Sequence, residues 1–286
     1  MLSKDWNKRK KKYDFIIIGS GYGGAITAAR ITAANPKPSV CILERGKEWE
    51  VGKFPDDIHE VKRSVRHDVF NPTGLYDFQL FPDISVMKGS GLGGTSLINA
   101  NVAIVPDQET FEQLAWPKNI KLPELMPFYE KAKTMLGARQ YNRPRASATG
   151  SLLKVKGLGK RAQEIGTKEF ALNLTVTQED GKNAAGFDQK ACNDCGDCVT
   201  GCNVGAKNTL YMNYLPTAAK QGCDIFTKVE VKWIEKRENG WRIHGVRYKT
   251  LSSEKFTLDA GNVILSAGSL GTPEILLRSE MRGLSL

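Results

Sequence analysis

No apolar run in the sequence approaches the ~20 residues that a membrane-spanning helix needs. The N-terminal region lacks the apolar core of a secretory signal peptide, because Phe15–Ile18 is too short and leads directly into glycines. No motif of interleaved aromatic and basic residues, of the kind that binds RNA, is present. We therefore predict a cytoplasmic protein with no transmembrane segment and no nucleic-acid partner.

Histidine is scarce, with three residues in a chain of 286. His59 and His67 have no neighbouring cysteines or paired acids, so we expect them at the surface. His244 falls in an expected hairpin, where a structural role is favoured. The formal charge of +10 is spread out apart from a basic run at residues 8–12. We interpret this run as a solvated extension, with attraction to a membrane surface or nucleic acid as the alternative.

A glycine-rich turn joins an expected strand to an expected helix near the N-terminus. Phe15–Ile18 is a short β-branched run typical of a buried parallel strand, and Ala25–Ile31 is a helix of small residues. Between them Gly19, Gly21 and Gly24 fit G-x-G-x-x-G. In this motif the first glycine permits a tight turn, the second lets backbone approach a pyrophosphate, and the third lets helix pack on strand. The helix N-terminus attracts the phosphates.

A carboxylate follows at the distance that dinucleotide binding requires. A second expected strand, Ser39–Leu43, ends in Glu44, twenty residues after Gly24. An acidic residue at this distance accepts hydrogen bonds from a ribose. Because its charge repels a 2′-phosphate, Glu44 argues against NADP. The sequence therefore predicts a dinucleotide-binding site.

A second glycine cluster, Gly89–Ser96, runs into the apolar segment Leu97–Val102. Glycine and serine cannot fill a core, so we expect this backbone to lie close to something large and flat or charged, rather than to form a linker. The preceding residues 46–88 show no sustained hydrophobic period. We expect them to be an irregular loop that covers something.

The remaining patterns predict helices and strands further along the chain. Helices are expected at 123–136 and 208–220, and a hairpin from strands 224–234 and 241–250 turns at Asn239-Gly240. A strand at 262–266 is followed by a helix with Thr272 as its cap and Pro273 at its first position.

Three stretches together resemble the glucose–methanol–choline (GMC) family of flavoprotein oxidoreductases, most closely its cholesterol-oxidase-like branch. They are residues 18–24 with Glu44–Gly46, then 89–102, then 267–277. The resemblance covers nearly the whole chain and thins between 106 and 190. It implies FAD rather than NAD, and an enzyme in which an alcohol, with a sterol-like one favoured, transfers a hydride to flavin N5.

The resemblance also assigns cofactor contacts. It implies that the first glycine turn holds the pyrophosphate, that Glu44 holds the ribose, and that the backbone of Val231 meets adenine. The second glycine segment would line the flavin ring, and Ala267 with Gly268 would end a strand beside it. The implied set is Gly19, Gly21, Tyr22, Gly23, Gly24, Glu44, Arg45, Gly93, Gly94, Asn99, Ala100, Asn101, Val102, Val231, Ala267 and Gly268.

No catalytic residue is expected in this chain. In the family a histidine, often beside an asparagine, handles the hydroxyl proton and lies in the C-terminal part, whereas this sequence stops at Leu286. None of the three histidines matches that position. We therefore expect the N-terminal portion of an alcohol oxidoreductase. The alternatives are a flavin-binding fragment that needs a second polypeptide, and an NAD-dependent dehydrogenase.

Four of the six cysteines lie together, and Cys192, Cys195, Cys198 and Cys202 have the spacing C-x2-C-x2-C-x3-C of a ferredoxin cluster run. Asn203 replaces the usual proline and no second run is present. We expect a 4Fe–4S cluster, with structural thiols or zinc as alternatives. A cluster would give electrons from reduced flavin an exit to a carrier protein.

The elements predict an α/β fold. A Rossmann-like FAD-binding domain is expected from residues 10–105 and 205–286, with an inserted substrate-domain segment at 106–204 that carries the cysteine quartet.

Overall fold

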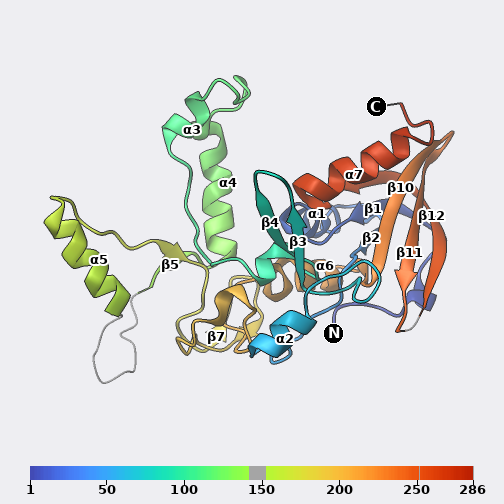
Figure 1. Cartoon of the computed structure of the whole chain (residues 1–286). Helices are drawn as coiled ribbons and strands as arrows, with labels where there is room; N and C mark the ends of the chain where they lie inside the picture. The colour runs from blue at the N-terminus through green and yellow to red at the C-terminus, as the bar shows by residue number, and fades with distance from the viewer. Residues whose placement is uncertain (142–152, 251, 286) are drawn as a thin grey trace. The chain divides into compact units, whose positions relative to one another are not determined.

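The computed structural model describes residues 1–141, 153–250 and 252–285, coloured along the chain in Figure 1. The chain divides into two compact units. Unit 1 contains Met1–Asn99, Asp197–Asn203 and Thr209–Leu286, and unit 2 contains Ala100–Gly196 and Val204–Asn208. The functional assignment of the two expected domains stays a prediction.

Unit 1 is built on a mixed six-stranded sheet in the order β10-β11-β12-β1-β2-β9 (Figure 1). Four strands are parallel and two antiparallel strands extend one edge. The α/β class is confirmed. The strands are β1 (Lys12–Ile18), β2 (Val40–Leu43), β9 (Asp224–Phe226), β10 (Val229–Arg237), β11 (Gly240–Tyr248) and β12 (Ser253–Leu265).

The three parallel strands at the centre of the sheet end together. Ile18 pairs with Leu43 on one side and with Leu265 on the other. Helix α1 (Tyr22–Ile31) carries the chain from β1 to β2, while the other neighbour of β1 arrives from the far end of the sequence. Ligands of open α/β sheets bind at such a reversal of strand order, outside the carboxyl ends of the strands.

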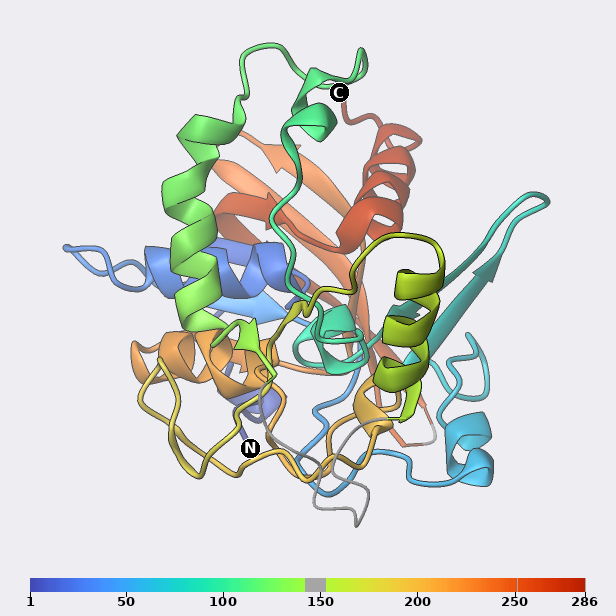
Figure 2. The same ribbon diagram turned by 90° about the vertical axis from the view of Figure 1, so that its left-hand side faces the viewer.

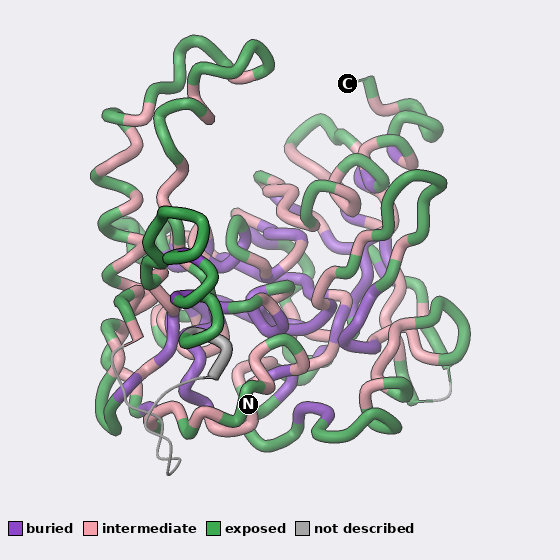
Figure 3. The backbone as a smooth tube through the Cα atoms, turned by 60° about the vertical axis from the view of Figure 1, so that its left-hand side comes forward, coloured by how far each residue is buried: buried purple, intermediate pink, exposed green. Residues whose placement is uncertain are grey.

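Opposite faces of β1 pack against different helices, because successive side chains of a strand point to opposite faces. Ile16 and Ile18 belong to one buried cluster with Ile275 of α7 (Gly268–Glu280). Ile17 faces α1, where its Cγ2 lies 3.3 Å from the position of a Cβ added at Gly24. Ile16, Ile17 and Ile18 are all buried, the class coloured purple in Figure 3.

The expectation of an irregular loop at 46–88 is wrong. Asp57 caps the short helix α2 (Ile58–Arg63), accepting from two backbone N–H groups. Strands β3 (Tyr76–Leu80) and β4 (Ser85–Gly89) form an antiparallel hairpin, which Figure 2 shows as a long ribbon. Phe78 and Leu80 are exposed on this ribbon, so the sequence shows no alternation between buried apolar and exposed polar positions.

Other expected elements differ from the structure at their ends. The expected strand 224–234 is two strands, because the chain turns at Lys228, whose φ is 59°. The Asn239-Gly240 turn is confirmed, with Arg237 paired to Gly240. Helix α7 begins at Gly268 rather than at Thr272, whose Oγ1 accepts from the backbone N–H of Ala267 at 3.1 Å.

The predicted helix at 123–136 is confirmed as α4 (Leu122–Met135). Helix α6 (Tyr214–Lys220) starts later than expected, after a 3-10 turn. No helix in the described ranges combines the length and apolarity needed to cross a bilayer. The other elements are η1 (Trp6–Lys8), η2 (Gly94–Leu97), α3 (Gln108–Glu112), β5 (Arg139–Gln140), α5 (Leu153–Glu164), β6 (Asn173–Leu174), β7 (Gly181–Lys182), β8 (Asp188–Gln189), η3 (Asp197–Val199) and η4 (Leu210–Met212).

The contact between α1 and the first turn predicts a large effect of one methyl group. A Cβ at Gly24 would lie 2.0 Å from the carbonyl oxygen of Gly19, so Gly24→Ala must push the helix from the strand. We expect the free energy of unfolding to fall by about 1–3 kcal/mol, measured by urea denaturation. Gly157→Ala in α5 is the control, since nothing lies within 4 Å of its added Cβ. Equal urea midpoints for the two variants would contradict the packing described.

Candidate functional site

A cavity of about 400 Å³ lies where β1, β2 and β12 end. Its walls come from unit 1 alone. They comprise the first glycine turn, the residues that follow β2 and β12, strand β4 with the glycine segment after it, and the start of β10. Helix α7 supplies Glu274, Ile275 and Arg278. The cavity is therefore at the position that the sheet topology favours for a ligand.

The three glycines of the first turn have distinct surroundings. Gly19 has a φ of 95°, and a Cβ there would lie 2.4 Å from the carbonyl oxygen of Ser266, so only glycine fits. Gly21 lines the cavity and has nothing within 4 Å of an added Cβ. Gly24 is the packing position behind the turn. The open side of Gly21, at the N-cap of α1, is where a ligand can approach the backbone closely.

Glu44 is a buried carboxylate, 7% exposed, that connects the ends of two strands. Its Oε2 accepts from Ser20 Oγ at 2.5 Å and from Ser20 N at 3.0 Å, and its Oε1 accepts from Gly46 N at 2.8 Å. The Ser20 hydroxyl in turn accepts from Gly93 N at 2.9 Å. A carboxylate has about four acceptor positions, so Glu44 keeps room for one further donor.

The second glycine segment packs directly against the first. A Cβ at Gly94 would lie 3.0 Å from Gly21 Cα, and one at Gly46 would lie 2.3 Å from Gly91 N. Ser90 lies in this segment and lines the cavity. Its hydroxyl is buried and has no hydrogen-bond partner in the described chain. Such an orphaned polar atom in a cavity wall points to a polar ligand.

Tyr22 contributes a phenol to the wall. Its hydroxyl accepts from Asn99 Nδ2 at 2.9 Å. Burial raises the pKa of Tyr22, against a smaller lowering by the bond from Asn99. The phenol therefore stays protonated at neutral pH and can donate its own hydrogen bond.

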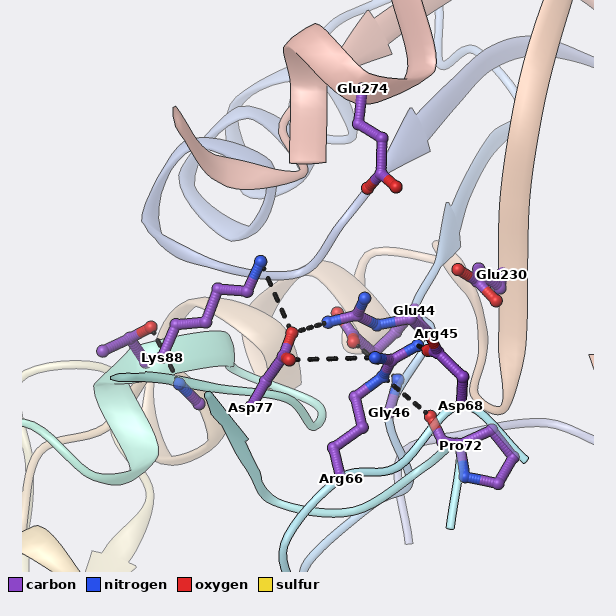
Figure 4. Close-up of polar contacts among 12 residues, drawn as sticks. Glu44, Arg45, Gly46, Arg66, Asp68, Pro72, Asp77, Lys88, Glu230 and Glu274 are labelled. Atoms are coloured by element: carbon purple, nitrogen blue, oxygen red, sulfur yellow. Dashed lines mark hydrogen bonds and ion pairs between the residues drawn. The ribbon is translucent and has the colours of Figure 1, made fainter. Parts of the chain in front are cut away.

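Asp77 is a buried carboxylate on β3 that gathers three cations next to the cavity (Figure 4). Arg45 reaches it at 2.6 Å, Lys88 at 3.4 Å and Arg66 at 3.7 Å. Burial, the largest influence, lowers the pKa of Arg45, but the charges of Asp77 and Glu230 outweigh it and raise the pKa above its ordinary value. Arg45 is therefore a permanent cation at the cavity.

Most of the predicted cofactor residues that belong to unit 1 meet at the cavity. Gly24, Gly93 and Asn99 lie outside its lining but contact it through Gly19, Ser20 and Tyr22. Ala100, Asn101 and Val102 fall in unit 2, so their assigned roles stay predictions. The predicted residues in the lining are Gly19, Gly21, Tyr22, Gly23, Glu44, Arg45, Gly94, Val231, Ala267 and Gly268.

Sequence reasoning missed several polar residues of the site. Ser20 occupies a position of the glycine motif that the motif leaves unspecified, and its hydroxyl joins Glu44 to Gly93. Lys88 and Ser90 flank Gly89, and their position next to the second glycine cluster was the available signal. Glu230 precedes Val231, but no sequence motif around it indicates a role in the site.

The predicted cysteine cluster finds no support. The described residues contain no group of three or more His, Cys, Asp or Glu that could hold a metal ion. The sulfur of Cys192 instead lies near Asp194, whose backbone N–H points to it at 3.5 Å. Spacing limits how far apart thiols can lie, but it does not determine where they point. Cys41, on β2, is fully buried.

The three histidines lie elsewhere. His59 and His67 are exposed, as expected. His244 stacks on Trp233 with ring centroids 3.5 Å apart and contacts Glu235 at 3.1 Å. None of the three lines the cavity.

Glu230 predicts a pH dependence of stability. Burial works to raise the pKa of this 8%-exposed residue, but hydrogen bonds with Lys232 and Tyr248 prevail and lower the pKa below its ordinary value of 4.5. A depressed folded pKa stabilises the protein above pH 4.5, and this contribution is lost as the pH falls through the folded value. We expect Glu230→Gln to cost about 1–2 kcal/mol at neutral pH.

Urea unfolding of the wild type and of Glu230→Gln between pH 3 and 7 measures the contribution of the Glu230 charge to stability. The difference in unfolding free energy between wild type and Glu230→Gln should shrink below pH 4.5. A difference that stays constant across this range would show that the Glu230 charge does not stabilise the fold.

Known proteins similar to this chain are oxidoreductases by their names. The chain is 31% identical to cholesterol oxidase of Mycobacterium tuberculosis, over 96% of this chain and 49% of that protein. It is 24% identical to oxygen-dependent choline dehydrogenase of Staphylococcus epidermidis, over 94% of this chain and 47% of that one. The chain thus spans about half the length of these curated relatives.

The fold is similar to the crystal structure of pyridoxine 4-oxidase from Mesorbium loti. The TM-score is 0.56 at 16% identity, covering 93% of this chain and 51% of that one. A family model described as GMC oxidoreductase matches residues 13–283, which include both glycine segments and the end of β12. This match shows that the chain belongs to the GMC oxidoreductase family.

Proposed function

We propose that this chain forms the FAD-binding part of an oxidoreductase that acts on the CH–OH group of alcohols. Family membership supports FAD as the cofactor. The observation that carries the proposal is the cavity at the ends of β1, β2 and β12, where the glycine turn, Glu44 and the second glycine segment meet. When bound, FAD supplies the acceptor for the hydride that an alcohol carbon loses.

The residues present fit such a cofactor. Gly21 and Gly268 both line the cavity, and neither has a protein atom within 4 Å of an added Cβ, which leaves space for a ligand against the backbone. The N-terminus of α1 offers unpaired N–H groups to a pyrophosphate. Glu44 retains acceptor capacity for a ribose hydroxyl. We infer that these groups bind and orient the nucleotide half.

The substrate half of the proposal rests on similarity. Identity to a cholesterol oxidase favours a sterol-like alcohol. The weaker identity to a choline dehydrogenase keeps a smaller, charged alcohol as a second substrate class. Both classes share oxidation at a carbon that bears a hydroxyl.

A flavin-binding chain without catalysis of its own is the second candidate. It is favoured by the absence of any histidine from the cavity lining in the described residues. General acid–base assistance contributes typically 10²–10⁴-fold to such reactions. On this proposal a second polypeptide provides the proton acceptor and the substrate pocket.

Gly21→Val tests cofactor binding separately from folding. The backbone of Gly21 has a φ of −65°, which valine accepts, and its open side means that the new side chain meets ligand rather than protein. We expect a folded variant that retains less than a tenth of the wild-type flavin, measured by absorbance after saturation with FAD.

Gly157→Val is the matched control, because it adds the same side chain in open surroundings outside the cavity. The control should retain its flavin. Full flavin content in Gly21→Val would exclude this cavity as the cofactor site.

Anaerobic mixing of the FAD-loaded chain with sterols and simple alcohols separates the two candidates. Because no imidazole lines the cavity, we expect flavin bleaching at least 100-fold slower than enzymatic turnover, consistent with a missing general base. Rapid bleaching would show that the chain is catalytically complete and would refute the need for a second polypeptide.

A further inference from the structure

Six charged side chains line the cavity, and five of them are engaged by hydrogen bonds. Glu44 is held by Ser20, Arg45 by Asp77 at 2.6 Å, and Glu230 by Lys232 at 2.7 Å. Glu274 and Arg278 bond to each other. Lys88 is the exception. Its ammonium makes no hydrogen bond within the described residues and has one ion pair, to Asp77 Oδ2 at 3.4 Å.

The position of Lys88 makes this exception significant. Its side chain is 20% exposed, so most of it is buried in the cavity wall. Partial burial of an ammonium is unfavourable unless other groups satisfy its donors. The ion pair with Asp77 leaves donors of the ammonium unused, because the contact is long and Asp77 Oδ2 is already bonded to Arg45. Lys88 therefore has donors available to an anion in the cavity.

Ser90 provides an independent observation two residues further on. Its hydroxyl is unpartnered in the described chain and its residue is 3% exposed. Gly89 between them is fixed by a bond from its N–H to Thr95 Oγ1 at 3.1 Å. The same segment brings Gly94 against Gly21, at the start of α1. Lys88, Ser90 and the positive end of α1 thus line one cavity.

We propose that Lys88 and Ser90 form a phosphate subsite, in which they bind the pyrophosphate of the cofactor together with the first glycine turn. This inference rests on the proposed function and names two binding residues beyond the glycine motif. A lysine ammonium is a compact point charge suited to phosphate, and a serine hydroxyl adds a neutral donor. Asp77 acts as a positioning residue, since its ion pair keeps the ammonium beside the cavity (Figure 4).

Binding of FAD and ADP to the full chain tests the subsite, because the two ligands share the pyrophosphate but only one carries a flavin. We expect Lys88→Met to weaken both by roughly 10- to 100-fold, the effect of losing a charge-assisted hydrogen bond. The affinity that remains should depend less on salt. Lys62→Met, which removes the same charge at an exposed site outside the cavity, should change neither affinity.

Ser90→Ala separates binding from structure. Because it removes a buried hydroxyl that has no partner, the free protein should be as stable as wild type or more so. Its affinity for FAD and ADP should nevertheless fall several-fold. A purely structural serine would not give this combination.

The outcomes distinguish two failures. A wild type that binds neither FAD nor ADP contradicts the proposed function and the subsite with it. A wild type that binds FAD, with unchanged affinity in Lys88→Met, contradicts the subsite alone. Loss of FAD affinity without loss of ADP affinity places Lys88 at the flavin ring and also overturns the subsite.

Discussion

The site depends on the hydrogen bonds of one buried carboxylate. Glu44 is 7% exposed, so its charge requires partners, and it takes them from Ser20 in the first turn and from Gly46. Through Ser20 the same network reaches Gly93. Three segments far apart in sequence are thereby fixed around one oxygen pair. Ser20 Oγ contacts the second segment directly, at Gly91 O (3.3 Å) and Gly93 N (2.9 Å), and its bond to Glu44 fixes the orientation of that hydroxyl.

The backbone prepares this arrangement. Gly19 N donates to Leu43 O at 2.9 Å, and Ser266 N donates to Ile18 O at 2.8 Å. Backbone hydrogen bonds alone therefore hold the ends of β1, β2 and β12 together. Around them each acidic group of the cavity is hydrogen-bonded to its own partners, whereas Lys88 has one ion pair and the Ser90 hydroxyl has no partner in the described chain. The residues that line the cavity all belong to unit 1. The described lining contains no histidine.

Local patterns predicted the parts of the fold that depend on local physics. The β-branched run before Gly19, the G-x-G-x-x-G turn and the Asn239-Gly240 hairpin each have a mechanism within a few residues. The sequence does not predict the β3–β4 hairpin because Phe78 and Leu80 are exposed on it. It misplaces the start of α7 because Thr272 lies inside the helix, where its hydroxyl accepts from the backbone N–H of Ala267. The roles of Ser20, Lys88 and Ser90 depend on tertiary contacts, or on the absence of a partner for the Ser90 hydroxyl. A single sequence does not show such contacts. The cysteine spacing indicated proximity but not the direction of the thiols.

Hydrogen exchange of backbone amides, with and without FAD, tests most directly whether the cavity at the strand ends holds the cofactor. The account predicts that FAD slows exchange after β1, β2 and β12, at residues 19–23, 44–46 and 266–271, and in the segment 89–95. Amides of the outer strands β10 and β11 beyond Val231 should exchange as before. Slowed exchange confined to other parts of the chain, with these four segments unchanged, would contradict it.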